Sequence, residues 1–280
     1  MKKIGFLIIN YNDYKTTNKL IDNIKDYKCL DEIVVVDNNS TDDSQKELEK
    51  NKEITLIKND ENLGFAKALN IGCRYLIQKY KDCSIFISNS DIRIKKEEDL
   101  KTLLTAFESE KVAVVGPVIK EPNAILKGFR LTSVFEDLML DVPLLNKFYK
   151  NKLISYKKSH YKDVISEVDM VKGCFFAIDS KALEYINYFD ENTFLYYEEN
   201  ILAKKLKTKN YKTVLHNDVT IFHDHEVTIS KNVNKKRQYN ITKESMMYYE
   251  KNYNHASKFS LLLFKILNSL NSMTLKIRNK

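Results

Sequence analysis

The chain has 280 residues, of which 43% are hydrophobic and 30% are charged, and its formal net charge at pH 7 is +8. This length suits one large α/β domain with an appended tail, and the absence of any apolar run of about 18 residues argues against a membrane-spanning protein. The positive charge favours an anionic partner, either a nucleotide or a phospholipid surface. No helix-turn-helix, zinc-finger or RNP-type signature accompanies it, so we expect no nucleic-acid partner.

The cysteines are scattered along the chain without CxxC spacing, at Cys29, Cys73, Cys83 and Cys174. Such spacing argues against a zinc site and indicates reduced thiols in the core. No secretory signal follows Met1, because polar residues interrupt the apolar run after Ile9. We therefore expect a cytoplasmic protein.

Residues 1–115 alternate between short apolar runs and segments with helical periodicity. The predicted strands lie at residues 4–9, 32–36, 54–57, 85–87 and 112–115. The predicted helices lie at residues 16–25, 44–50, 65–80 and 100–107. Strands that alternate with helices predict an α/β fold, with a mostly parallel central sheet and helices on both of its faces.

The pattern is less regular from residue 121 to 168, a segment rich in lysine and tyrosine that contains Pro122 and Pro143. We expect a loop-and-helix insertion there. Regular elements then return, as strands at residues 171–178, 211–215 and 219–222 and helices at residues 180–185 and 201–206. From about residue 235 the chain is helical and basic.

Polar clusters follow three of the predicted strands, at residues 10–12, 37–39 and 89–91. Open α/β sheets bind ligands at the carboxyl ends of their strands, so three clusters at one edge predict one site. Asn, Asp and Ser also dominate ordinary turns. Asp91 is the first candidate for chemistry; alternatively, it caps the helix that follows.

The two commonest phosphate-binding loops, GxGxxG and GxxxxGK[ST], are missing. Asn62, Gly64 and Lys67 instead surround the start of the long predicted helix. Gly64 allows close approach of the backbone, and the amino end of a helix favours negative charge. We expect these residues to contribute to nucleotide binding.

Several segments, in their order along the chain, resemble the inverting family 2 glycosyltransferases of the GT-A fold: IINYN, VVVDNNSTDDS, ENLGFAKALNIG, ISNSD, GCFFAID, FDE and FLYYEEN, followed by a histidine after a strand. The similarity is greatest to the rhamnosyl- or galactofuranosyltransferase-like subgroup, which builds bacterial surface polysaccharides. It implies a GT-A domain at residues 1–230, with a nucleotide-sugar half at 1–118 and an acceptor half at 119–230. A basic amphipathic tail would follow at residues 231–280.

The resemblance implies a nucleoside-diphosphate sugar donor, UDP- or dTDP-linked, and a saccharide or lipid-linked glycan acceptor. Asp37 would hydrogen-bond the base or ribose of the donor, a task that suits a carboxylate. The other nucleotide-sugar-binding residues would be Asn10, Asn12, Asn39, Asn62, Gly64, Lys67 and Asn89.

A divalent metal, Mg²⁺ or Mn²⁺, is also implied, because residues 89–91 occupy the place of the family's DxD motif. The first Asp of that motif is Asn89 here, so Asp91 is the expected carboxylate ligand. One carboxylate can suffice, since these ions also take phosphate oxygens and waters. His223 stands where family members carry a histidine that completes the metal site or touches the diphosphate, and His225 is the competing choice.

Glu198 and Glu199 match the family's acidic pair at the start of a helix, where the second acid is the usual catalytic base. The pair is Glu-Glu instead of the commoner Glu-Asp, so both acids stay candidates for the base. Without the resemblance, two acids in a first helical turn would simply favour the helix dipole.

The tail has apolar residues at helical spacing, namely Phe259, Leu262, Leu263, Ile266, Leu267, Leu270 and Met273. Basic residues flank or interrupt them, namely Lys258, Lys265, Lys276, Arg278 and Lys280. Such a helix can lie on an anionic membrane surface, as in a peripheral protein. It can equally pack on the body of the protein or on another subunit, as in a homodimer.

Two other functions are compatible with this fold class. A sugar nucleotidyltransferase would need a loop rich in Gly and Arg or Lys after the first strand, where this chain has residues 10–13, Asn-Tyr-Asn-Asp. A non-catalytic nucleotide- or carbohydrate-binding module would keep the fold without a base. The presence of Asp91, Glu199 and His223 together argues against such a module.

Overall fold

The computed structural model describes residues 2–224 and 235–278, with the side chains of residues 2–224 and 236–272. Within that part of the chain, one ten-stranded sheet runs through the molecule in the order β3-β2-β1-β4-β9-β6-β10-β5, and β7 and β8 pair with β6 and β10. The strands are β1 (Lys3–Asn10), β2 (Glu32–Asp37), β3 (Thr55–Lys58), β4 (Cys83–Ser88), β5 (Ile92–Arg93), β6 (Val112–Glu121), β7 (Ala124–Leu126), β8 (Ile165–Val168), β9 (Phe175–Asp179) and β10 (Lys212–His223).

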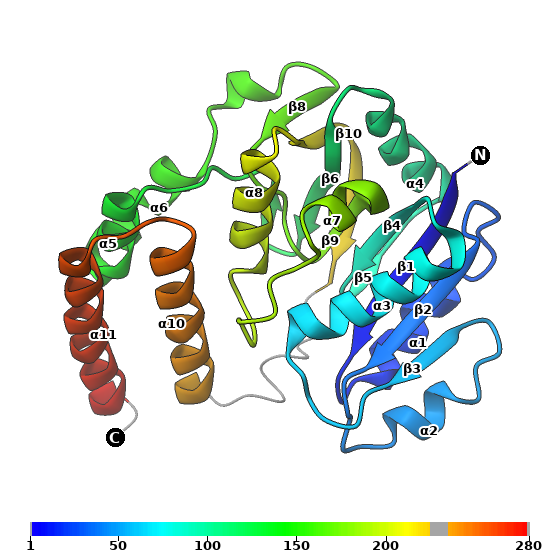
Figure 1. The fold of residues 1–280 in the computed structure, drawn as a ribbon, viewed down its shortest axis with the longest axis horizontal. Coiled ribbons are helices and arrows are strands. Elements are labelled where there is room, and N and C mark those ends of the chain that lie inside the picture. The colour runs from blue at the N-terminus through cyan, green and yellow to red at the C-terminus, as the bar shows by residue number, and fades with distance from the viewer. Residues whose placement is uncertain (1, 225–234, 279–280) are drawn as a thin grey trace.

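Helices cover both faces of this sheet (Figure 1). They are α1 (Tyr14–Ile24), α2 (Ser44–Leu48), α3 (Phe65–Tyr80), α4 (Glu97–Leu104), α5 (Val134–Asp141), α6 (Pro143–Ile154), α7 (Ser180–Tyr185), α8 (Glu198–Thr208), α10 (Lys235–Asn252) and α11 (Lys258–Arg278), with short 3-10 turns η1 (Thr105–Glu108) and η2 (Lys158–Tyr161). Apolar residues of α1, α2 and α4 belong to the core on one face. Those of α3, α7 and α8 belong to the core on the other.

The predicted α/β fold is confirmed, and the sheet is mixed. Strands β1 to β4 pair in parallel, as expected from their alternation with helices. Strand β9 then runs antiparallel to both of its neighbours, β4 and β6. The strand predicted at residues 171–178 begins only at Phe175, because residues 173 and 174 form a turn instead.

The insertion at residues 121–168 contains the expected helices, α5 and α6, with Pro143 at the first helical position. It also contains two short strands, β7 and β8, that the pattern did not predict. The strands predicted at residues 211–215 and 219–222 are one strand, β10, which shifts register between His216 and Thr220. Asp91 does not cap α4, because β5 follows it directly and α4 has Lys96 at its N-cap.

The predicted helical tail is present as α10 and α11. On α11, Phe264 is fully buried, the Asn271 side chain donates to the carbonyl of Asp141 on α5 at 2.8 Å, and Tyr239 of α10 donates to the carbonyl of Asn268 at 3.1 Å. One side of α11 therefore packs on the body of the protein. Among the described residues, no helix is both long enough and apolar enough to span a bilayer.

Candidate functional site

The acidic pair stands at the start of α8, as its sequence position suggested. The two residues before it, Tyr196 and Tyr197, both have left-handed backbone conformations, with φ of 75° and 70°. Bulky side chains rarely adopt this conformation, and it is kept only where surrounding contacts enforce it. The turn therefore fixes the direction in which Glu198 and Glu199 leave the backbone.

The two acids have different environments. Glu198 is buried, and Oε1 of its carboxyl group has no hydrogen-bond partner in the described part of the chain. Burial, with repulsion from Glu199, raises the pKa of Glu198 to about 8. Glu198 is therefore mostly protonated at neutral pH, whereas Glu199 is only partly buried.

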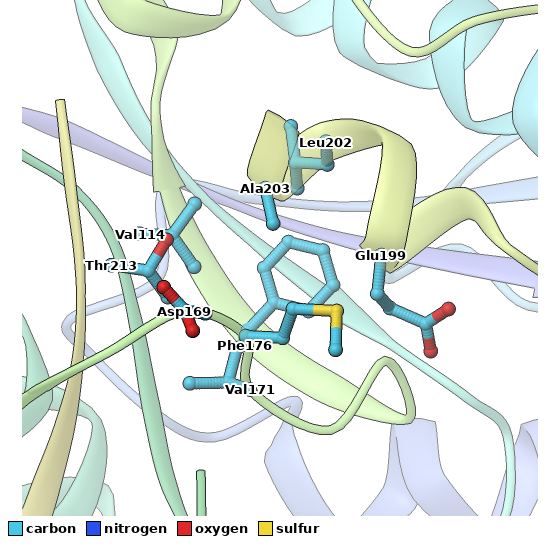
Figure 2. A pocket seen from close by; sticks show the side chains of 9 residues that line it. Val114, Asp169, Val171, Phe176, Glu199, Leu202, Ala203 and Thr213 are labelled. Carbon is cyan, nitrogen blue, oxygen red and sulfur yellow. The ribbon is translucent and has the colours of Figure 1, made fainter. Parts of the chain in front are cut away.

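Glu199 lies against the turn that precedes β9. A β-carbon added to Gly173 would fall within 3 Å of three atoms of the Glu199 side chain. Glu199 also lines a small hollow of about 10 Å³ between α8 and the sheet. Figure 2 shows Glu199 at one side of this hollow, with Phe176 and Leu202 among its apolar lining and Asp169 on the far side of Phe176.

The predicted metal ligands are brought together from the turn between β4 and β5 and from the end of β10. Nε2 of His223, the last residue of β10, lies 3.2 Å from Oδ1 of Asp91, and both side chains are almost buried. Nδ1 of His223 lies 3.1 Å from Oε1 of Glu121. Burial acts to lower the pKa of His223, but contacts with Asp91 and Cys174 outweigh it and raise the pKa to about 11. His225 lies outside the described residues.

One turn connects this pair to the acids of α8. The backbone N–H of Asn89 donates to the carbonyl of Cys174 at 2.8 Å, and the thiol of Cys174 also contacts His223. Gly173, the preceding residue, contacts Glu199. Residues 173 and 174 thus contact both His223 and Glu199.

Asp91 also lines a second hollow, of about 120 Å³, together with Lys19 and Asn23 of α1 and with Arg93 and Asp224. Arg93 pairs with Asp224 at 3.0 Å across this hollow. This hollow is distinct from the one beside Glu199, so the two predicted reactive groups border different spaces in this structure.

Asp37, at the end of β2, is fully buried. Its carboxylate accepts hydrogen bonds from Asn10 at 2.7 Å, from the N–H and hydroxyl of Ser40, and from Gln45 at 2.9 Å. Those contacts hold the loop after β2 against the end of β1. The predicted contact of Asp37 with the donor base or ribose stays a prediction, because no atom of Asp37 reaches solvent here.

The residues on either side of this loop are more accessible. Asn12 and Asn39 are partly exposed and have left-handed backbones, with φ of 54° and 61°. The side-chain oxygen of Asn12 accepts from the N–H of Thr41 at 2.7 Å. The two asparagines therefore present polar groups at the sheet edge where the sequence predicted a ligand.

The start of α3 is tied to the acidic segment. Asn62 accepts hydrogen bonds from Asn38 at 3.0 Å and from the N–H of Gly64 at 3.1 Å. Gly64 has φ of 83°, and a β-carbon there would lie 2.6 Å from the carbonyl oxygen of Phe194. The N–H of Phe65 donates to that same oxygen at 2.8 Å. Only glycine fits at position 64. The close contact between Gly64 and Phe194 joins the predicted nucleotide-binding turn at residues 62–67 to the segment that leads into Glu198.

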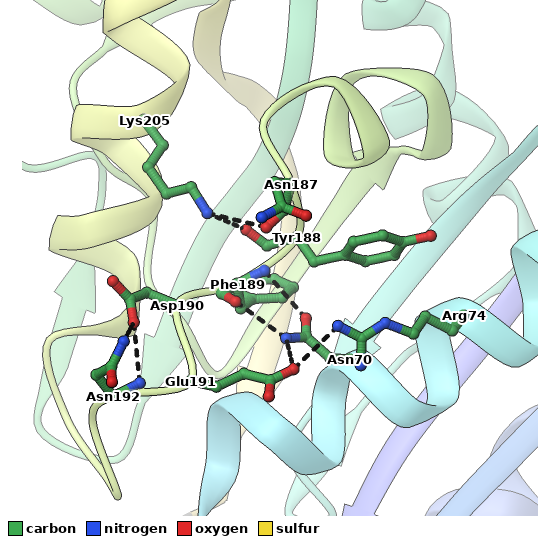
Figure 3. A network of polar contacts seen from close by, with 9 residues as sticks. All are labelled: Asn70, Arg74, Asn187, Tyr188, Phe189, Asp190, Glu191, Asn192 and Lys205. Carbon is green, nitrogen blue, oxygen red and sulfur yellow. Dashed lines mark hydrogen bonds and ion pairs between the residues drawn. The ribbon is translucent and has the colours of Figure 1, made fainter.

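Figure 3 shows a second connection between these segments. The side chain of Asn70 on α3 donates to the carbonyl of Phe189 and to Glu191 and accepts from the N–H of Phe189. Burial acts to raise the pKa of Glu191, but hydrogen bonds from Asn70 and Arg74 outweigh it and lower the pKa. Lys67, one turn earlier on α3, is partly exposed.

Helix α10 holds the same acidic segment from the other side. Ser245 donates to the carbonyl of Leu195 at 2.8 Å, and Gln238 donates to the hydroxyl of Tyr196 at 2.8 Å. Tyr248 donates to Asp190 at 2.9 Å, and Tyr253 donates to the same oxygen. Part of the tail is therefore built into the candidate site.

The residues present fit a divalent metal that takes some of its ligands from a bound substrate. They do not fit a metal whose ligands all come from the protein. Asp91 and His223 offer one carboxylate and one imidazole, and Glu121 can accept the Nδ1 proton of His223, which orients the ring. A metal bound at Nε2 would replace the proton there, because only the neutral ring has a lone pair for it. Among the described residues, no group of three or more His, Cys, Asp and Glu side chains is arranged to hold a metal. Mg²⁺ and Mn²⁺ accept few protein ligands where phosphate oxygens and waters supply the rest.

Several residues of this arrangement were not predicted from the sequence, namely Glu121, Gly173, Tyr196, Gln238 and Ser245. Gly173 lies within the segment GCFFAID, which carried part of the family resemblance, so its position could have been noticed. Glu121 and Ser245 carry no local signal. Glu121 lies 102 residues from His223, and Ser245 lies 50 residues from Leu195.

Comparison with known proteins is consistent with this geometry. The family model described as glycosyl transferase family 2 matches residues 6–186. The chain is 25% identical over 210 residues to the low-salt glycan biosynthesis hexosyltransferase Agl10 of Haloferax volcanii, covering 74% of this chain and 62% of that protein. It is 35% identical over 113 residues to the dTDP-rhamnosyl transferase RfbF of Shigella flexneri, covering 40% and 37%. The chain thus spans less than two thirds of either relative.

Among solved structures, GalNAc-T7 with UDP, GalNAc and Mn²⁺ is similar, with a TM-score of 0.66 and 13% identity over 89% of this chain and 48% of that one. At this identity the similarity establishes the fold alone. It confirms the GT-A fold that the resemblance implied.

Proposed function

Because this chain belongs to glycosyl transferase family 2, we propose that it transfers a sugar from a UDP- or dTDP-linked donor to a saccharide or lipid-linked saccharide, with inversion at the anomeric carbon, in cell-surface polysaccharide synthesis. The dTDP-rhamnosyl transferase among its relatives supports a dTDP-linked donor, and the glycan biosynthesis hexosyltransferase supports a role in glycan synthesis. The order of the site segments along the chain supports it further.

The catalytic base in this proposal is Glu199. A base must be ionised and must reach the acceptor hydroxyl. Glu199 is partly exposed and borders a hollow, whereas burial raises the pKa of Glu198 to about 8 and keeps it mostly protonated at neutral pH. The proton of the acceptor hydroxyl would pass to a carboxylate oxygen of Glu199 as that hydroxyl attacks. Glu198 would orient its neighbour.

Asp91 and His223 would hold a divalent metal, Mg²⁺ or Mn²⁺, together with the donor diphosphate. A metal bound there supplies positive charge to the departing diphosphate. Glu121 accepts from Nδ1 and keeps the His223 ring oriented. The Mn²⁺ in the structure of GalNAc-T7 with UDP supports a divalent ion in this fold.

The donor nucleotide would lie over the strand ends, next to Asn12, Asn39 and the Asn62–Gly64–Lys67 turn. Asn10 and Asp37 would order the loop on which Asn39 stands, because their side chains bond each other. Asn89, whose N–H is bound by Cys174, would face the diphosphate. The acceptor would approach along α8 and the insertion.

The observation that carries the proposal is the turn at residues 173–174. Cys174 contacts His223 and binds the Asn89 backbone, while Gly173 contacts Glu199. One short turn therefore contacts both the predicted metal ligand His223 and the predicted base Glu199, which supports placing them in one site.

The test is to incubate the full chain with UDP-, dTDP- and GDP-sugars, Mn²⁺ and saccharide or lipid-linked acceptors, and to measure release of nucleoside diphosphate with analysis of the anomeric product. The proposal expects one donor to be consumed with inversion. Release of pyrophosphate from a nucleoside triphosphate and a sugar phosphate would instead identify a nucleotidyltransferase. Donor binding without turnover for any acceptor or donor would identify a binding module.

A further inference from the structure

Three helices at one end of the molecule carry large apolar side chains that the described part of the chain leaves uncovered. We name this set the end face; its members are Phe135 of α5, Leu144 and Phe148 of α6, and Phe259, Leu262, Ile266 and Leu270 of α11, which are 49% to 70% exposed. Figure 1 shows these helices together at the end of the molecule away from β3. We propose that the end face docks on an anionic lipid bilayer.

The exposed stripe of α11 is its outer side. At 100° per residue, positions 259, 262, 266 and 270 all fall roughly opposite Phe264, which is fully buried. Asn268 and Asn271 bond to α10 and α5. The inner side of α11 is therefore already occupied, and the outer apolar stripe has no remaining partner within the described chain.

Helix α6 has an unusual distribution of its apolar residues. None of its twelve residues is buried. Leu144 and Phe148 are four positions apart, so they project from the same side of the helix, and both are about two-thirds exposed. A surface helix of a globular protein normally turns its apolar residues toward the core. The outward apolar residues of α6 are instead typical of a helix that binds a partner outside the described chain.

The charges around the end face select the partner. Helix α6 carries Lys147, Lys150 and Lys152 and no acid, and the described side chains of α11 include Lys258 and Lys265 and no acid. Two of the three acids of α5 pair with basic side chains, Glu136 with Arg130 and Asp141 with Lys243, and Asp137 accepts a hydrogen bond from Thr132. Apolar side chains ringed by lysines match an acyl boundary beneath anionic headgroups.

A second copy of this chain is a poorer match to the same surface. An isologous dimer places identical patches against each other, which would bring the lysines of α6 and α11 close to lysines of the copy. Like charges that face one another across an interface oppose association. An anionic bilayer neutralises these lysines and covers the apolar side chains in the same step.

The test is sedimentation of the full chain with vesicles of phosphatidylcholine, with and without phosphatidylglycerol. Binding is expected to the mixed vesicles and to weaken with salt. Leu144→Ser with Phe148→Ser, or Leu262→Ser with Ile266→Ser, should each lower partitioning by about tenfold or more. The matched control is Ile125→Ser with Val164→Ser, which changes two exposed apolar residues outside these helices and should bind like the parent.

Circular dichroism and thermal unfolding of every variant establish that the fold is kept, as expected for exposed positions. Equal vesicle binding by the end-face variants and the control would overturn the proposal. The proposal would also be overturned if sedimentation velocity without lipid showed a dimer and the end-face substitutions dissociated it. Both measurements are independent of sugar transfer, so their failure leaves the proposed enzymatic function untouched.

Discussion

The carboxyl group of Glu199 rests directly against the backbone of Gly173, so that a β-carbon at position 173 would lie 1.8 Å from Oε1. The contact joins the first turn of α8 to the turn that leads into β9. Because the nearest atoms belong to the far end of a flexible side chain, an added methyl group would displace Glu199 and leave the backbone in place. This relationship allows the position of the proposed base to be changed without changing the base itself.

Gly173→Ala should lower turnover by about 10²-fold, the cost of a misplacement of about 1 Å in an active site, with little change in melting temperature. Steady-state kinetics and thermal unfolding measure the two effects. In a Glu199→Gln background, Gly173→Ala should lower turnover little further, because the displaced side chain can no longer act as a base. Fully additive losses would show that Gly173 acts on something other than Glu199.

Glu199→Gln should reduce turnover by about 10²- to 10⁴-fold, as expected for loss of a general base, while donor affinity stays nearly unchanged. Glu198→Gln should be milder, because burial already raises the pKa of Glu198 to about 8 and its neutral form resembles glutamine. Single-turnover transfer by the two variants compares them directly. Near-normal transfer by Glu199→Gln would eliminate it as the base.

Asp91→Asn should abolish metal-dependent binding of the donor diphosphate and leave the fold intact, since Asp91 is the only carboxylate in its motif. Titration calorimetry with the nucleoside diphosphate and Mn²⁺ measures the affinity. Asp224→Asn is the matched control, because Asp224 lines the same hollow but pairs with Arg93. Unchanged donor affinity in Asp91→Asn would show that the metal binds at another site.

Glu250 of α10 should make the protein less stable as pH rises. It is fully buried, and burial together with the charge of Asp137 raises its pKa from 4.5 to about 8. A folded-state pKa above the unfolded value means that the folded chain binds more protons between the two values. The free energy of unfolding should therefore fall from about pH 4.5 up to about pH 8.

Glu250→Gln should make that fall smaller, leaving the contribution of Glu198, whose pKa burial also raises to about 8, and should be more stable than the parent at pH 8.5, by on the order of 1 to 3 kcal/mol. Denaturant unfolding at several pH values measures the difference. Glu244→Gln, which changes an exposed acid on the same helix, should keep the parent profile. Parallel profiles for the parent and Glu250→Gln would rule out Glu250 as the source of the pH dependence.

Much of the site could be located from local sequence. Strand-end polar clusters such as Asn89-Ser90-Asp91 are local patterns, and the register of parallel strands brings them to one edge whatever the distant packing. The order of the motifs identified the family, which the family model confirms over residues 6–186. The helical tail was also predictable, because apolar spacing in one helix depends on that helix alone.

Contacts between distant segments were decided only by the tertiary structure. The burial that separates Glu198 from Glu199, the pairing of His223 with both Asp91 and Glu121, and the internal bonds of Asp37 all depend on which side chains meet in space. The antiparallel β9 and the division of α11 into an inner and an outer side depend on the same packing. Residue type and spacing determined which chemical groups are available; desolvation and long-range contacts, which have no local signature, determined how each group is held.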